Sequence, residues 1–148
     1  MSKPRSNPLR LISHMLASLF NSRAAFYREW ERYDGKPGRD PVEGRWQGEW
    51  ISERNGHRGE LKCVLVEAGP ECCRAYFYAT FSKLFRVGYE TDLKREQTEK
   101  GVRLRGEQNL GALAGGTYRS EGEVQGDQFI CHYSCKYDQG RFQLRRVT

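Results

Sequence analysis

Hydroxyl and amide side chains recur at alternate positions in several short segments of this 148-residue chain, among residues that are otherwise apolar. Alternate residues of a β-strand point to the same face, so we expect these groups to share a buried face with their apolar neighbours. A buried polar group costs about 1–3 kcal/mol when it has no hydrogen-bond partner. An apolar cavity with a few polar groups is the usual form of a small-molecule site. The residues concerned are Tyr89, Thr91, Gln108, Tyr118, Ser120 and Tyr133.

The same face carries Gly48, Gly106 and Gly122, which remove side-chain volume from the interior. We therefore predict an internal pocket that binds a ligand. Its expected lining is Trp50, Phe77, Tyr89, Tyr118 and Tyr133. The alternative is a filled interior, in which the polar groups bind one another or a few internal waters.

The histidines and carboxylates give little support for catalysis. His57 follows an Asn-Gly turn and is the candidate acid–base group of an enzyme, but no inward-facing carboxylate accompanies it. No Ser/His/Asp set is recognisable, and residues 111–116 lack the Lys-Ser/Thr that follows a phosphate-binding loop. We predict a protein without enzymatic activity, and its sequence indicates no particular cofactor.

The five cysteines are expected to be free thiols in a reducing compartment, which favours the cytoplasm. Cys131 and Cys135 lie four residues apart on a predicted strand, so their Cα atoms would be ~13 Å apart, whereas a disulfide needs less than about 7 Å. The adjacent Cys72 and Cys73 would form only a strained bridge. No cysteine pair has zinc-type spacing, and we predict no metal site.

Positive charge is concentrated near the N-terminus. Residues 1–41 carry eight Lys/Arg and four Asp/Glu, whereas residues 42–148 carry seventeen and fifteen, within a net charge of +6. A nucleic-acid-binding domain needs a basic face on its folded part. The near-neutral balance of residues 42–148 therefore argues against a nucleic-acid partner.

Residues 8–33 have the periodicity of an amphipathic helix, with apolar residues at steps of three and four. The stripe runs through Leu9, Ile12, Leu16, Leu19, Phe26, Trp30 and Tyr33, and only Arg23 interrupts it. The glycines and proline of residues 34–38 end this helix. We expect it to pack on the rest of the protein; the alternatives are a contact with a membrane surface or a partner protein, or a targeting segment. Residues 1–41 thus form a tail, helix and linker, and residues 42–148 form one domain.

Eight segments of that domain alternate apolar and polar residues, as half-buried strands do. The connections are too short for helical crossovers, so neighbouring strands are expected to be antiparallel. A mainly β fold follows, an eight-stranded up-and-down barrel preceded by the helix, because closure removes exposed strand edges; a sandwich is the alternative. The predicted strands are 44–53, 58–66, 73–81, 85–93, 102–110, 117–124, 128–136 and 141–147, and residues 94–101 are expected to form a charged loop.

Gly44-x-Trp46 at the first strand, with an arginine-bearing last strand, resembles the calycin superfamily of lipocalins, fatty-acid-binding proteins and avidins. This resemblance implies that Trp46 lies at the closed end of the barrel and that Arg145 or Arg146 stacks across it. The chain departs from the lipocalin pattern in its length and short loops, and it has no counterpart of avidin's biotin-contacting loop. Residues 44–50, 55–57 and 136–140 are also similar to a bacterial barrel family without an assigned function.

Taken together, these features predict non-enzymatic binding of a small, largely apolar molecule inside a calycin-like barrel. The alternative is a structural or interaction module without an internal ligand. In that case the basic helix within residues 8–33 would dock on a partner or a membrane surface.

Overall fold

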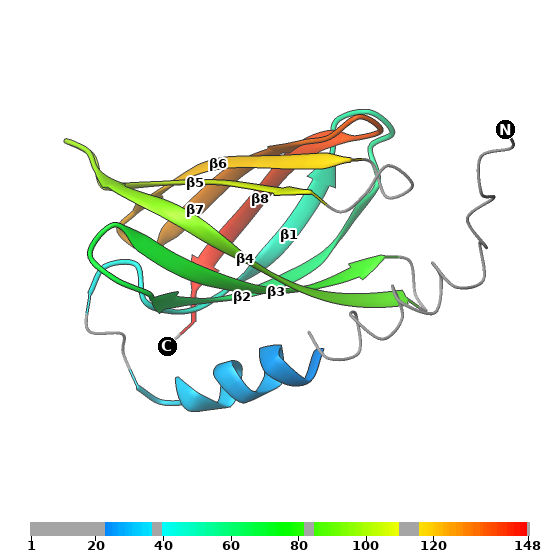
Figure 1. Cartoon of the computed structure of the whole chain (residues 1–148). Coiled ribbons are helices and arrows are strands. Elements are labelled where there is room, and N and C mark those ends of the chain that lie inside the picture. Colours follow the sequence, from blue (N-terminus) through cyan, green and yellow to red (C-terminus); the bar gives the residue numbers. More distant parts are fainter. Residues whose placement is uncertain (1–22, 37–39, 82–84, 110–115, 148) are drawn as a thin grey trace, which may run out of the picture.

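Eight antiparallel strands close into an up-and-down barrel in the computed structural model (Figure 1). The structure describes residues 23–36, 40–81, 85–109 and 116–147. Each strand pairs with the next along the chain, and β8 pairs with β1 to complete the circle. The strands are β1 Gly44–Ser52, β2 Arg58–Glu67, β3 Cys72–Phe81, β4 Phe85–Gln97, β5 Val102–Asn109, β6 Thr117–Gln125, β7 Gln128–Ser134 and β8 Gln139–Arg146. The predicted fold class is therefore confirmed.

One end of the barrel, at the start of β1 and the end of β8, is closed by Trp46. Its side chain is fully buried, and its indole Nε1 donates to the Val42 carbonyl at 3.0 Å. The Arg146 guanidinium carbon lies 4.4 Å from the centre of the Trp46 ring, and Nη1 of Arg146 donates to the Glu43 carbonyl at 2.9 Å. This stacked arginine on the last strand is the arrangement that the resemblance implied for Arg145 or Arg146.

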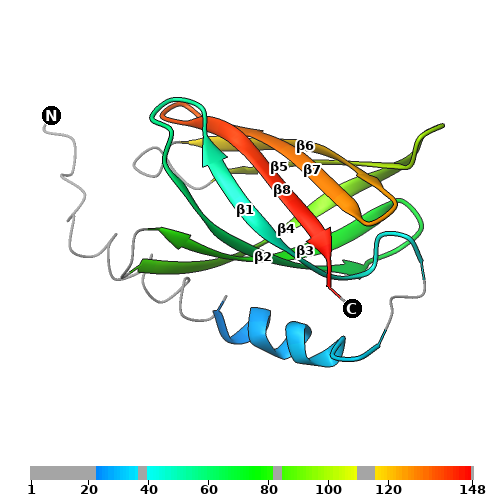
Figure 2. The same ribbon diagram turned by 180° about the vertical axis from the view of Figure 1, so that it is seen from behind.

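A helix covers the outer face of β2 and β3, and the structure describes it over residues 23–32 (Figure 2). Phe26 is buried and stacks on Tyr78, with ring centres 5.2 Å apart. Trp30 lies between two cations, Arg45 at 5.1 Å and Lys62 at 5.3 Å from its ring centre. Residues 23–33 of the predicted amphipathic stretch thus pack on the barrel, while its earlier part lies outside the described residues. No helix within the described ranges has the length and apolarity to cross a membrane.

Strand β4 continues to Gln97, so the prediction of a charged loop from residue 94 was wrong. Charged residues follow one another in this segment, and no apolar residue alternates with them. Alternation therefore could not identify it as part of a strand. This extension pairs with β5 through Lys94↔Arg105 to Gln97↔Val102. Arg95 places a charge at an inward-facing position of β4. Its Nη1 donates to Oδ2 of Asp40 at 3.0 Å, and this ion pair balances the charge.

The cysteines are all free, as predicted. Cys63, Cys73 and Cys131 are buried, and Cys72 and Cys135 are half-buried. Strand β7 ends at Ser134, so Cys135 lies in the connection to β8 rather than on the predicted strand. Asp138 shapes that connection, because its carbonyl accepts from the Cys135 amide at 2.8 Å.

Candidate binding site at the open end of the barrel

The two ends of the barrel differ in how deeply their inward-facing residues are buried. On β4, β5 and β6 the residues near Trp46, such as Leu93, Leu104 and Val124, are at most 3% exposed. Further along the same strands, the inward-facing residues are only half-buried. These residues are Tyr89, Thr91, Gly106, Gln108, Tyr118 and Ser120. Solvent therefore reaches the interior from the end opposite Trp46, on the side of β4 to β6.

The opposite side of this open end is a dry aromatic wall, made of Trp50, Phe77, Tyr133 and Phe142. All four side chains are less than 10% exposed. Phe142 lies between two of them, with ring centres 5.6 Å from Phe77 and 5.1 Å from Tyr133. Tyr89 stacks on Phe77 at 4.9 Å. Phe142, a residue outside the predicted lining, thus joins Phe77 to Tyr133, and Tyr89 joins this group through Phe77.

Two glycines let the aromatic wall lie flat against the neighbouring strands. A Cβ atom on Gly59 would lie 2.5 Å from Nε1 of Trp50, and one on Gly140 would lie 2.6 Å from the Tyr133 hydroxyl. The Trp50 indole instead donates to the Thr80 carbonyl at 3.0 Å. Side chains at these two positions would push the rings of Trp50 and Tyr133 away from the neighbouring strands. The close approach of the rings to the backbone therefore requires glycine at both positions.

A carboxylate at the rim fixes the position of Tyr133. The Tyr133 hydroxyl donates to Oδ2 of Asp138 at 2.9 Å, and Oγ of Ser52 donates to Oδ1 at 2.6 Å. The Gln139 amide also donates to Oδ1, at 2.9 Å. The sequence did not predict this network, because Ser52 and Asp138 lie 86 positions apart. The local pattern around Ser52 indicates only a strand end, and that around Asp138 indicates only a turn.

The half-buried side forms a polar wall, which we define as Tyr89, Thr91, Gln108, Tyr118 and Ser120. The side chains of Thr91, Gln108 and Ser120 make no hydrogen bond to any residue that the structure describes. Buried or half-buried polar groups are normally satisfied by protein, water or ligand. These three groups are therefore available to water or to a bound molecule.

The tyrosines at this end remain neutral at physiological pH. Burial raises the pKa of Tyr89 well above its ordinary value of 10.0. Burial, followed by a hydrogen bond with Cys135, raises the pKa of Tyr118 to about 12. Burial also raises the pKa of Tyr133, and its hydrogen bond to Asp138 adds to the effect. Each of these side chains therefore presents a neutral hydroxyl group.

The pairing between β4 and β5 stops short of the polar-wall residues. The β4–β5 ladder runs only from Gln97↔Val102 to Lys94↔Arg105, although β4 stays paired with β3 back to Phe85. Beyond Lys94 the two strands diverge toward the open end (Figure 1). The same register would place Thr91 opposite Gln108, so the unpaired strand edges border two polar-wall residues.

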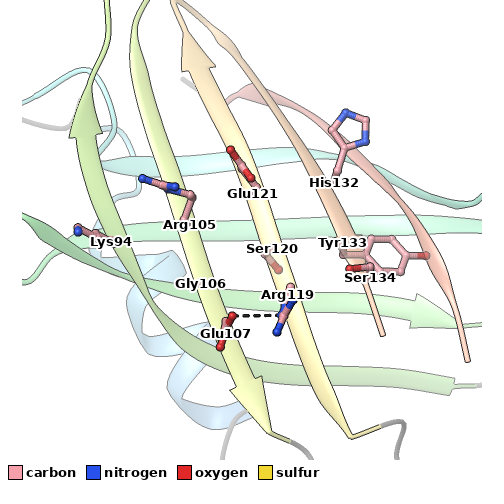
Figure 3. Close-up of a pocket in the computed structure, with 10 residues that line it drawn as sticks. All are labelled: Lys94, Arg105, Gly106, Glu107, Arg119, Ser120, Glu121, His132, Tyr133 and Ser134. Atoms are coloured by element: carbon pink, nitrogen blue, oxygen red, sulfur yellow. Dashed lines mark ion pairs between the residues drawn. The ribbon is translucent and has the colours of Figure 1, made fainter. Parts of the chain in front are cut away.

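A depression of about 660 Å³ lies over β5 to β7 and is lined by residues of both faces of these strands (Figure 3). We call it the outer basin. Gly106, Ser120 and Tyr133 border it from the inward face, and its outward-facing residues are Lys94, Arg105, Glu107, Arg119, Glu121, His132 and Ser134. Arg119 and Glu107 form an ion pair at 3.1 Å, Arg105 is paired with Glu96 at 2.8 Å, and Glu121 faces Arg103 at 3.9 Å. Both arginines and both glutamates of the outer basin thus already have partners and are exposed to solvent, so its outer face is a weaker candidate site than the interior.

The remaining candidates for chemistry belong to neither wall of the open end. His57 is exposed in the turn between β1 and β2. Carboxylate oxygens of Asp40, Glu43 and Glu67 lie within 4.8 Å of one another near the closed end. Burial alone would raise the pKa of Asp40, but hydrogen bonds from the Glu43 and Val42 amides and from Arg95 outweigh it, and the pKa is lowered. Asp40 is thus already satisfied by donors of the protein itself.

Comparison with known proteins adds no family or relative. No protein-family model matches the chain, and neither a curated protein nor a solved structure matches it significantly.

Proposed function

We propose that this protein is a calycin-like barrel that binds a small, largely apolar molecule at its open end without transforming it. The observation that carries the proposal is the pairing of two unlike walls. A dry aromatic wall faces half-buried polar groups, three of which lack a partner among the described residues. Such a combination offers apolar surface for affinity and a few polar groups for orientation.

The stacked Trp46 and Arg146 support the calycin-like assignment, because they reproduce the closed end that the resemblance implies. The free cysteines suit a reducing compartment, and we propose the cytoplasm.

A contact of residues 8–33 with a partner protein or a membrane surface is the second proposal from the sequence. In the described part, Phe26 and Tyr33 are buried against the barrel. The face left exposed carries Arg28, Glu31 and Arg32. Docking through the apolar side chains would require this part of the helix to leave the barrel, so the internal site is preferred.

The proposal is tested by titration with Nile red, a neutral dye whose emission rises and shifts to the blue in apolar surroundings. We expect saturable binding that Ser120→Trp weakens by at least about tenfold, which corresponds to about 1.4 kcal/mol, because the indole would fill the space before the polar wall. Thr117→Trp is the matched control, since Thr117 is exposed on the outer face of the same strand. Equal dye binding by wild type and Ser120→Trp would contradict an internal site.

A further inference from the structure

The charges of the inward-facing residues are unevenly divided between the two ends of the barrel. Two arginines occupy inward-facing strand positions, Arg95 on β4 and Arg146 on β8, and both lie at the closed end. Arg95 is paired with Asp40 at 3.0 Å. Arg146 donates to the carbonyls of Pro41 and Glu43 and lies beneath the Trp46 ring. Neither cation is available to a molecule at the open end, because each is already bound and Trp46 separates Arg146 from the interior.

The open end offers polar groups without formal charge. Its inward-facing residues, among those whose side chains the structure describes, are apolar or glycine except for the tyrosine hydroxyls, Ser52, whose hydroxyl is bound to Asp138, and the three unpartnered groups Thr91, Gln108 and Ser120. The carboxylate at the rim, Asp138, is negative and already accepts from Tyr133 and Ser52. Lys94, Arg105 and Arg119 share a depression with Ser120, but they lie on the outer face of the strands. Inside the barrel an anionic headgroup would therefore lose its hydration without meeting an inward-facing cation, and Asp138 would repel it. A hydroxyl or carbonyl group would find donors and acceptors.

From this distribution we infer that the ligand is an electrically neutral amphiphile, such as an alcohol, ketone or ester with an apolar body, and not a carboxylate or phosphate. Its apolar part lies on Trp50, Phe77 and Phe142, and its single polar end binds Thr91, Gln108 or Ser120. This inference rests on the proposed function, because it names the ligand class of the same site.

The experiment compares 1-decanol with decanoate as competitors of Nile red at pH 8, where the acid is fully ionised and both carry the same chain. We expect decanol to displace the dye and decanoate to be at least about tenfold weaker, a difference of about 1.4 kcal/mol. Decanoate that competes as well as decanol overturns the inference and leaves the proposed function standing. Failure of both competitors against a bound dye also overturns it, whereas failure of the dye itself to bind contradicts the proposed function.

A second arm introduces the missing charge. Gln108→Arg places a cation on the polar wall and should raise the affinity for decanoate by at least about tenfold, with little change for decanol. Thr117→Arg adds the same charge on the outer face at the same end and should leave both competitors unchanged. Ser120→Lys repeats the test from β6 in case Gln108→Arg does not fold, as judged by circular dichroism. Decanoate binding that rises equally in Thr117→Arg would show a general effect of charge and overturn the assignment of the polar wall.

Discussion

Trp46 and Arg146 show how much of the closed end depends on two side chains. The guanidinium group covers the ring at 4.4 Å and also donates to the carbonyls of Glu43 and Pro41. It therefore ties the linker before β1 to the last strand. The amide of Val147, just after β8, donates to the Arg45 carbonyl at 2.9 Å and closes the same junction.

Removing this arginine should destabilise the whole barrel. For Arg146→Ala we expect a loss of roughly 2–3 kcal/mol in the free energy of unfolding, because the stacking contact disappears and two carbonyls lose a charged donor. Arg145→Ala is the matched control, since Arg145 is exposed on the outer face of the same strand, and it should cost less than about 0.5 kcal/mol. Urea denaturation measures both. Equal midpoints for the two variants would show that the stacked pair does not stabilise the closed end.

At the scale of elements, the incomplete β4–β5 ladder has an electrostatic explanation. Continued in register, it would place Asp92 directly opposite Glu107, and like charges in such positions are destabilising. Each carboxylate instead faces an arginine on its other neighbouring strand, Asp92 with Arg74 at 3.0 Å and Glu107 with Arg119 at 3.1 Å. We therefore attribute the divergence of β4 and β5 beyond Lys94 to this repulsion.

Neutralising one of these carboxylates should lengthen the ladder. In Glu107→Gln we expect slower hydrogen exchange of the backbone amides in residues 106–109, by roughly 1.4- to 5-fold, since the relieved repulsion is about 0.2–1 kcal/mol. Glu121→Gln also removes an acidic group from the outer basin, but it does not face β4, and it should leave these amides unchanged. Unaltered exchange in Glu107→Gln would assign the divergence of the strands to another cause.

The same elements show what local sequence patterns can predict. Alternation located all eight strands and sent Trp50, Phe77 and Tyr133 to the interior, because the pleat ties side-chain direction to position along the strand. It failed beyond Leu93, where Arg95 faces inward against Asp40, a linker residue 55 positions away. It also could not find the rim network, since Ser52 and Asp138 are brought together only when β8 pairs with β1. Contacts made by closure of the barrel leave no local signal.

For the molecule as a whole, the interior contains acidic groups that ionise only at high pH. Burial raises the pKa of Cys131 to about 12. Burial, with a smaller contribution from Cys72, raises the pKa of Cys73 to about 12. In the unfolded chain a thiol ionises near pH 8.5. The free energy that these thiols contribute is therefore fully present below about pH 8.5 and is lost as pH rises toward 12.

We accordingly expect the free energy of unfolding to fall between pH 9 and pH 10.5, by up to about 1.4 kcal/mol per pH unit for each thiol. Cys131→Val should reduce this slope, and Cys73→Val combined with Cys131→Val should reduce it further. Urea titrations at a series of pH values give the slopes directly. A slope that is the same in wild type and the double variant would show that these thiols do not govern the alkaline limit.

The three tryptophans occupy three different surroundings. Trp30 lies between two cations beneath the helix, Trp46 is sealed at the closed end, and Trp50 belongs to the wall that a ligand would contact. Intrinsic fluorescence therefore separates three events without an added label. Undocking of the helix changes the emission of Trp30 and occupancy of the interior changes that of Trp50, whereas the emission of Trp46 changes only when global unfolding alters all three.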